Sequence, residues 1–297
     1  MIVPFLILLF FAPPAERGTL PLGLDLYRPV PEDNPLTREK VALGRRLFFD
    51  KRLSHDRTIA CATCHNPKRA FTDGRLVAVG VEGRTGMRNV PTLINRVYGR
   101  SFFLDGRAAT LEQQAIEPIL NPLEMNLTLP EIKARTGLEP EEVTRALASF
   151  VRTIVSGDSP YDRYTNGKPG ALSAEARFGL SVFRGKGRCI SCHAGPNLTD
   201  ERFHNTGIAW AGGELRDPGH GGGAFKVPTL REVARTGPYM HDGSLGTLED
   251  VVNYYDRGGN PNPGLDSDLN PLHLTPEEKR TLVAFLRSLS GNIRSGL

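Results

Sequence analysis

All four cysteines of the chain lie in two short motifs of the same kind. Residues 61–65 read CATCH and residues 189–193 read CISCH, so each motif has two thiols three positions apart and then a histidine. Two thiols at this spacing can add to the two vinyl groups of one haem, and the adjacent histidine can ligate its iron. We therefore predict two covalently bound haems c, held by Cys61, Cys64 and His65 and by Cys189, Cys192 and His193.

Other uses of paired cysteines fit the sequence less well. A redox-active dithiol does not need the histidine. A zinc site of four cysteines usually spaces its pairs by about 15–20 residues, whereas Cys61 and Cys189 are 128 positions apart. An exported protein with four cysteines could also form disulfides, but the two motifs leave no cysteine over for a bridge.

The residues around the two motifs suggest an internal repeat. An apolar residue, a glycine and a phenylalanine precede each motif, and an aspartate follows it. These positions are Leu43, Gly44, Phe48 and Asp73 in the first copy and Phe178, Gly179, Phe183 and Asp200 in the second. The pattern favours two cytochrome-c-like modules, each with a helix that leads into its haem motif.

Periodic apolar residues and capping side chains predict helices along most of the chain. Thr37 is the expected N-cap of the first helix, and Thr275 with Glu278 forms a capping box. No region shows the strong alternation of a strand, so the predicted fold class is mainly α with loop-rich connections. The expected helices are 37–49, 110–120, 139–155, one from Ser173 into the second motif, 247–256 and 275–289.

Chain length and one irregular segment predict two domains. A chain of 297 residues can bury two cores of ordinary size. Glycine, proline and aspartate interrupt the helical pattern over residues 156–170, which we interpret as an inter-domain linker. The predicted domains are residues 20–160 with the first haem and residues 167–290 with the second.

The amino terminus has the character of an export signal. Residues 1–11 form an apolar run that is too short to span a bilayer, for which about 20 residues are needed. We interpret residues 1–15 as a signal peptide with cleavage near Ala15, which predicts a periplasmic protein. An uncleaved interfacial anchor is the alternative, since no basic residue precedes the run.

Composition argues against nucleic-acid binding. The formal net charge is only +4, and no block of basic residues with interleaved aromatic residues is present. The hydrophobic fraction of 39% and the charged fraction of 24% are those of a globular protein.

Beyond the two haem motifs, several segments resemble a known family. They are LGRRLFFDKRLS before the first motif, GMRNVPTLIN (86–95), LDGRAATLEQQA (104–115), NPLEM (121–125), FKVPTLREV (225–233) and GPYMHDGSLGTLEDVV (237–252). In this order they are similar to the bacterial dihaem cytochrome c peroxidases and their MauG-type relatives. The similarity covers nearly all of residues 43–289.

The resemblance implies unequal roles for the two haems. The N-terminal haem, with His65 as proximal ligand, is the one where peroxide binds, and the C-terminal haem passes electrons. Gln114 and Glu124 match the residues over the open face of the first iron. A carboxylate there can move a proton from the inner to the outer peroxide oxygen. A calcium ion between the domains would take Asn89 and the carbonyls of Thr236 and Pro238.

Three positions depart from the peroxidase pattern. Val81 stands where many peroxidases have a histidine that ligates the first iron, and valine cannot ligate. Leu104 stands where a tryptophan is thought to lie between the haems, and the chain's only tryptophan is Trp210, in an unrelated loop. Tyr255 aligns with the methionine that ligates the second haem. This last exchange is typical of the MauG-type members.

The helix over 247–256 supports an inward position for Tyr255. Leu248, Val251, Val252 and Tyr255 recur on one helical face, whereas Tyr254 points the other way. Tyr255 is therefore the predicted iron ligand opposite His193, and a core tyrosine that only packs is the alternative. A phenolate favours ferric or higher iron, whereas methionine raises the potential.

Beyond the first motif, four histidines lie outside the two motifs. His241, in the YMHDG segment, matches a family motif and is expected to support the inter-domain site. The others, His204, His220 and His273, are expected at the surface.

These observations predict a periplasmic dihaem oxidoreductase of this family. It would reduce hydrogen peroxide at the first haem with electrons from a small donor protein such as a c-type cytochrome. A MauG-type enzyme that oxidises a substrate protein is the alternative, and a dihaem electron carrier without enzymatic activity is a further one. A homodimer is one candidate assembly.

Overall fold

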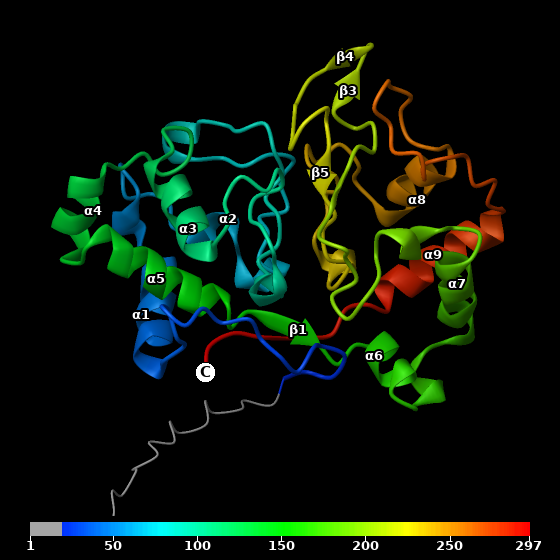
Figure 1. Ribbon diagram of the computed structural model, residues 1–297, viewed down its shortest axis with the longest axis horizontal. Helices are drawn as coiled ribbons and strands as arrows, with labels where there is room; N and C mark the ends of the chain where they lie inside the picture. The colour runs from blue at the N-terminus through cyan, green and yellow to red at the C-terminus, as the bar shows by residue number, and fades with distance from the viewer. Residues whose placement is uncertain (1–19) are drawn as a thin grey trace, which may run out of the picture.

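The computed structural model describes residues 20–297 of the chain. The predicted signal peptide, residues 1–15, lies outside these residues. In the described part, no helix is long and apolar enough to cross a membrane. Helices make up most of the regular structure and the strands are short (Figure 1), so the predicted mainly α class is confirmed.

The helices of the first half surround one hydrophobic core. Buried apolar side chains between residues 41 and 154 form this core. The α-helices are α1 (Arg38–Phe48), α2 (Cys61–Cys64), α3 (Leu111–Leu120), α4 (Leu129–Thr136) and α5 (Pro140–Val151). Short 3-10 turns lie between them, namely η1 (Lys51–Leu53), η2 (Pro67–Arg69), η3 (Val81–Gly83) and η4 (Arg96–Tyr98).

A second core lies among the helices of the other half. Its buried apolar residues fall between 172 and 289. Figure 1 shows the two helical bodies side by side, with irregular loops facing each other between them. The elements are α6 (Pro160–Thr165), α7 (Ala174–Arg184), α8 (Leu248–Asp256) and α9 (Pro276–Arg287), with 3-10 turns η5 (Pro169–Ala171), η6 (Cys189–Ser191) and η7 (Val233–Arg235).

Two glycines allow equivalent helix pairs in the two halves. A Cβ added at Gly44 in α1 would lie 1.9 Å from the Ala146 carbonyl oxygen in α5. A Cβ at Gly179 in α7 would lie 1.8 Å from the Thr281 carbonyl oxygen in α9. Both helix pairs therefore approach at a distance that only glycine permits, and both glycines belong to the repeat seen in the sequence.

The strands pair in three small antiparallel sheets. β1 (Val155–Gly157) pairs with β6 (Asn292–Arg294), and Ile293 packs against the first core. Thus the carboxyl-terminal segment, beyond the predicted boundary at residue 290, returns to the first half. The remaining pairs are β2 (Phe203–His204) with β5 (Phe225–Lys226) and β3 (Trp210–Ala211) with β4 (Glu214–Leu215).

The helix starts follow the sequence more closely than the helix ends. Thr37, Ser173 and Thr275 cap their helices as predicted. The helix expected over 139–155 ends at Val151, because the chain turns there so that Ile154 enters the core and Val155 begins β1. The helix expected to reach the second motif ends at Arg184, since Gly185 turns the chain.

The segment predicted as an inter-domain linker, residues 156–170, contains the end of β1, α6 and η5; residues 156–162 form a partly buried joint, and residues 165–170 are exposed. The Asp162 carboxylate in α6 takes two hydrogen bonds from Arg231, at 2.8 and 3.0 Å, and both side chains are 2% exposed. The adjacent Glu232 accepts the Ser156 hydroxyl at 2.5 Å and the Gly291 amide at 2.6 Å. These buried polar contacts satisfy the charges that the joint encloses.

Candidate haem sites

The first CATCH motif forms one helical turn. α2 brings Cys61 and Cys64 to the same side of the turn, as the spacing of three requires. The His65 amide closes the turn on the Cys61 carbonyl at 2.8 Å. The ring Nδ1 of His65 lies 3.1 Å from the Phe71 carbonyl oxygen, so the ring is held through Nδ1. A carbonyl partner at one ring nitrogen is the usual way in which a protein orients a histidine ligand.

The second motif repeats this geometry. η6 begins at Cys189, and the His193 amide donates to the Cys189 carbonyl at 3.0 Å. The His193 Nδ1 lies 3.0 Å from the Leu198 carbonyl oxygen. Burial lowers the pKa of both His65 and His193, which favours neutral imidazoles. The His65 ring has a further hydrogen bond to the backbone of Pro91, whereas in the described residues the His193 ring is hydrogen-bonded through Nδ1 only, which leaves its Nε2 available as a ligand atom.

The thiols also fit covalent haem attachment. All four cysteines are free and partly buried. Burial raises the pKa of Cys61 and Cys189 to about 12 and that of Cys64 and Cys192 to about 11. A redox dithiol needs a thiol that ionises near neutral pH. The two motifs therefore have the donor set for haem and lack the electrostatics of a dithiol catalyst.

Tyr255 borders the second motif. Burial raises the pKa of its hydroxyl, and the charges of Cys189 and Cys192 add to this effect, which places the phenol close to both sulfur atoms. Tyr255 is partly buried, and its hydroxyl has no hydrogen bond to protein within residues 20–297. The phenol oxygen is therefore free to meet a further group. A haem iron opposite His193 would be such a group.

The prediction that Tyr254 points away from the interior is wrong. Tyr254 is 1% exposed, and its hydroxyl donates to the Thr206 carbonyl at 2.7 Å and accepts the Asn260 amide at 3.1 Å. The assumption that α8 has one buried face is wrong, because other segments pack against two of its sides. The second motif lies on the side of Tyr255, and the loops at residues 206–207 and 259–260 cover the side of Tyr254.

Glu124 lies beside the first motif. Its charge contributes to the raised pKa of both Cys61 and Cys64, which places the carboxylate near them. Burial also raises the pKa of Glu124 itself, while a hydrogen bond of 2.8 Å from the Asn121 side-chain amide opposes the rise. The Gln114 side chain, on α3, has no hydrogen bond in the described part of the chain. Both side chains thus have capacity left for a ligand.

The Val81 loop supports the turn that carries Glu124. The Val81 amide donates to the Glu124 carbonyl at 2.8 Å, and the Val81 side chain is fully buried in the first core. A Cβ at Gly80 would lie 2.0 Å from the Leu123 carbonyl oxygen, so this loop and this turn are in direct backbone contact.

Leu104 lies where the two halves meet. Its carbonyl accepts the Lys226 amide of β5 at 2.8 Å. The Lys226 ammonium group is 7% exposed and donates to the Ser101 carbonyl oxygen, with the Glu201 carboxylate 3.9 Å away. Sequence reasoning missed this buried lysine, because nothing near it along the chain distinguishes it from a surface lysine.

The three predicted calcium ligands are free of competing donors. The Asn89 side-chain amide donates to the carbonyls of Arg75 and Leu76, at 2.7 and 3.3 Å, which leaves Oδ1 without a donor. Within the described residues, the Thr236 and Pro238 carbonyls accept no hydrogen bond either. The backbone amide of Asn89 donates to the His241 carbonyl at 2.7 Å, so His241 lies beside the predicted calcium site between the two halves. Calcium itself stays a prediction.

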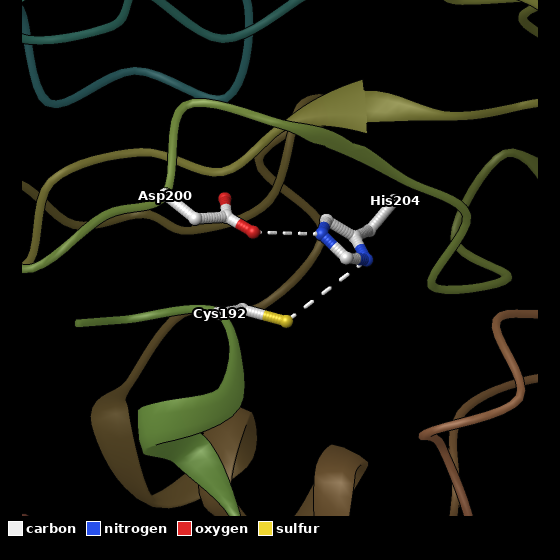
Figure 2. Close-up of side chains that lie close together, drawn as sticks. All are labelled: Cys192, Asp200 and His204. Atoms are coloured by element: carbon white, nitrogen blue, oxygen red, sulfur yellow. Dashed lines mark hydrogen bonds and ion pairs between the residues drawn. The ribbon is translucent and has the colours of Figure 1, made fainter.

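A cluster beside the second motif shows that the surface position expected for His204 is wrong. Figure 2 shows His204 between Asp200 and Cys192, with 3.1 Å from Nε2 to Asp200 and 3.9 Å from Nδ1 to the Cys192 sulfur. Asp266 lies 2.5 Å from Nδ1. Burial lowers the pKa of His204, but the hydrogen bonds to Asp266 and Asp200 outweigh this and raise it overall.

The cluster has donor atoms that a metal ion could use, since Cys192, Asp200 and His204 each offer one within 4.8 Å of the others. Cys192, however, belongs to the haem motif, and the two carboxylates raise the pKa of His204, which favours its protonated form over metal ligation. We therefore assign the cluster to the surroundings of the second haem. Asp266 could not have been found from the sequence, because it lies 62 positions from His204.

Comparison with known proteins defines the class. A sequence profile described as di-haem cytochrome c peroxidase matches residues 38–141. The methylamine utilization protein MauG of Methylorubrum extorquens is 42% identical over 289 residues, which cover 88% of this chain and 81% of that protein. The cytochrome-c peroxidase IdrP1 of Denitromonas iodatirespirans is 36% identical and covers 91% of this chain and 86% of its own.

The structure agrees with these sequence relationships. The crystal structure of a MauG-like protein associated with microbial copper homeostasis has a TM-score of 0.84 to this chain at 32% identity, with 95% and 96% of the two chains covered. The chain belongs to the family of dihaem cytochrome c peroxidases and MauG proteins. This family consists of haem-containing oxidoreductases, and it implies two haem cofactors.

Proposed function

We propose that the protein is a periplasmic dihaem c-type oxidoreductase that reduces hydrogen peroxide at the N-terminal haem, with electrons supplied through the C-terminal haem. The observation that carries this proposal is Glu124, a half-buried carboxyl group with a raised pKa beside the first CATCH motif. When bound, the first haem supplies the iron at which the O–O bond is cleaved, and the second supplies a redox centre.

The chain's own residues would move the proton and orient the peroxide. A carboxyl group whose pKa is raised above its ordinary value can both accept and return a proton, which is the role we assign to Glu124. Asn121 holds one Glu124 oxygen and fixes the direction of the carboxyl group. The Gln114 amide, free of other partners, would donate to or accept from the bound peroxide.

Val81 predicts that the first haem site is open without prior reduction. The side chain is apolar and fully buried, so it offers no ligand that must first leave the iron. We expect the fully oxidised protein to react with peroxide directly.

A MauG-type oxidation of a partner protein is the second candidate. Tyr255 beside the second motif and the 42% identity to a MauG protein favour it. A phenolate ligand at the second haem would stabilise its oxidised states.

One spectroscopic experiment separates an enzyme from an electron carrier. The oxidised two-haem protein should show one high-spin and one low-spin ferric haem in its EPR and visible spectra, and peroxide should change the spectrum at once. Two low-spin haems that do not respond to peroxide would contradict the proposed function and would favour a dihaem electron carrier without enzymatic activity.

An assay with different electron donors then distinguishes the peroxidase from the MauG-type enzyme. Continuous peroxide consumption with a reduced c-type cytochrome supports the peroxidase. Stable oxidised states that a cytochrome does not discharge, but a substrate protein does, support the MauG-type reaction. Calcium between the domains is part of the proposal, and metal analysis before and after chelation tests it.

A further inference from the structure

The only tryptophan of the chain lies on a projecting hairpin. Trp210 begins β3, and a Gly212-Gly213 turn with positive φ values leads into β4 (Figure 1). Residues 211–216 are exposed, but Trp210 itself is partly buried and its indole Nε1 donates to the Gly222 carbonyl at 3.2 Å. The indole is therefore held in place at the surface.

Three hydrogen bonds, joined by one step along the backbone, lead inward from this indole. The Gly222 carbonyl that accepts the Trp210 proton also accepts the Asn205 side-chain amide at 2.9 Å. Thr206 follows Asn205 along the chain, and its carbonyl accepts the Tyr254 hydroxyl at 2.7 Å.

From Tyr254 the contact continues to the second haem motif. The rings of Tyr254 and Tyr255 lie edge to face, with centroids 5.7 Å apart. Tyr255 in turn lies close to Cys189 and Cys192. The two tyrosines and Trp210 thus form one connected series between the second motif and the surface hairpin.

We propose that Trp210 is the surface end of an electron path that runs through Tyr254 to the second haem motif. The inference rests on the proposed function, because peroxide is the oxidant that draws the electrons. Tryptophan and tyrosine are the side chains of this series from which one electron is most readily removed. A reduced one-electron donor protein bound at the hairpin would refill Trp210.

Electrons and protons balance in both situations. With a donor protein, two one-electron transfers through Trp210 and two protons from solvent reduce one hydrogen peroxide to two waters. Without a donor, the indole and one water molecule together lose two electrons and two protons, and the oxygen atom of that water is added to the indole, while one hydrogen peroxide accepts the two electrons and two protons and becomes two waters.

The surroundings of the two side chains decide where oxidation accumulates. The Tyr254 hydroxyl is enclosed and donates to a backbone carbonyl, which is a poor base, so no strong base accepts this hydrogen bond and could remove the proton on oxidation. The Trp210 indole also donates to a backbone carbonyl, but its side chain is partly exposed, so water can accept the indole proton on oxidation. Tyr254 is therefore the bridge, and Trp210 is the residue that becomes oxidised.

The test treats the two-haem protein with hydrogen peroxide in the absence of a donor. Tryptophan fluorescence reports on Trp210 alone, and the tryptic peptide 203–216 contains Trp210 but no cysteine, methionine or tyrosine. We expect the fluorescence to fall and this peptide to gain one oxygen atom. Met87, which is 69% exposed, is the internal control for direct attack by peroxide and should be oxidised later.

Two variants test the path itself. Tyr254→Phe should abolish the oxidation of Trp210 while peroxide is still consumed. The matched control is Tyr239→Phe, because Tyr239, which is partly buried, likewise donates its hydroxyl to a backbone carbonyl, that of Val233 at 2.9 Å, but lies outside the path. If Tyr254→Phe folds poorly, EPR of Trp210→Phe replaces it, and the organic radical signal formed by peroxide should be lost.

The outcomes separate the path from the function. Peroxide that is consumed while Trp210 stays intact, equal oxidation in Tyr254→Phe and Tyr239→Phe, or a radical signal unchanged in Trp210→Phe would each overturn the path alone. Peroxide that is not consumed at all by the wild-type protein would overturn the proposed function and the path with it.

Discussion

At the scale of single residues, Tyr254 and Tyr255 show how neighbours on one helix acquire different chemistry. Tyr254 is fully buried and Tyr255 partly buried, and Tyr254 has a carbonyl acceptor and an amide donor, whereas Tyr255 has neither among residues 20–297. A satisfied phenol contributes to stability, and an unsatisfied one costs free energy until a ligand meets it. The difference in hydrogen bonding, more than the difference in burial, separates the structural tyrosine from the candidate iron ligand.

The first prediction at this scale concerns proton transfer by Glu124. Glu124→Gln keeps an oxygen that can accept from Asn121 but removes the acid, so the reaction with peroxide should slow by ~10²–10⁴-fold. Stopped-flow spectroscopy of the oxidised protein measures the rate, and the haem content should be unchanged. An unaltered rate would return Glu124 to the role of a buried structural carboxylate.

A second prediction concerns Tyr255. Tyr255→Met should raise the reduction potential of the second haem, because a thioether stabilises ferrous iron and a phenolate stabilises ferric iron. Spectroelectrochemical titration gives the potential. Tyr254→Phe is the matched control, since it removes a hydroxyl from the same helix without removing the proposed ligand.

The control variant Tyr254→Phe is itself expected to change the stability of the protein. Tyr254→Phe should leave the potential unchanged but lower the free energy of unfolding by about 1–3 kcal/mol, because the Asn260 amide loses its acceptor. A potential that shifts with Tyr254 and not with Tyr255 would contradict the assignment of the ligand.

At the scale of elements, each half depends on one close helix pair. α1 crosses α5 at Gly44, and α7 crosses α9 at Gly179, each with backbone in contact with backbone. These pairs hold the helices that precede the two haem motifs. The glycine that is repeated in the sequence is therefore required for close packing of each helix pair, which the sequence alone did not show.

The third prediction tests this packing. Gly44→Ala should destabilise the protein by about 1–3 kcal/mol, because the new Cβ would collide with the Ala146 carbonyl and force the helices apart. Helix propensity alone would predict a gain of about 1 kcal/mol from this exchange. Gly170→Ala is the control, since a Cβ there meets nothing within 4 Å. Thermal or urea unfolding measures both, and a stabilised Gly44→Ala would contradict the close contact.

At the scale of the whole molecule, the two halves are held together by buried charge. The Glu201 carboxylate pairs with Arg96 at 2.7 Å. The Lys226 ammonium group lies 3.9 Å from the same carboxylate, and no other carboxylate of residues 20–297 pairs with it. Burial, followed by the charge of Arg96, lowers the pKa of Lys226 to about 7, while Glu201 and Asp105 oppose the shift. Lys226 thus carries an unfavourable charge at the boundary between the halves.

The fourth prediction follows from this pKa. Between pH 7 and about 10.5 the unfolded chain binds the Lys226 proton and the folded protein does not, so the stability contribution of Lys226 should increase as the pH rises through this window. Lys226→Met removes this increase. Unfolding of both proteins from pH 7 to 9.5 gives the difference, in which the other titrating groups cancel. Parallel pH profiles would show that Lys226 keeps its ordinary pKa.

Local sequence signals determined the haem motifs, the helix starts and the mainly α class. A capping side chain lies next to the helix it caps, and the two thiols and the histidine of each motif are contiguous, so short-range patterns suffice. The same signals identified Tyr255 and Glu124, although only together with the family resemblance.

Only the tertiary structure determined which segments far apart in the sequence contact one another. It buried Tyr254 under the loop at 206–207, paired His204 with Asp266, returned β6 to the first half and enclosed Lys226 near Glu201. The physical reason is the same in each case. Burial and hydrogen-bond partners come from residues tens of positions away, and a periodic pattern within one helix carries no information about how many of its faces other segments will cover.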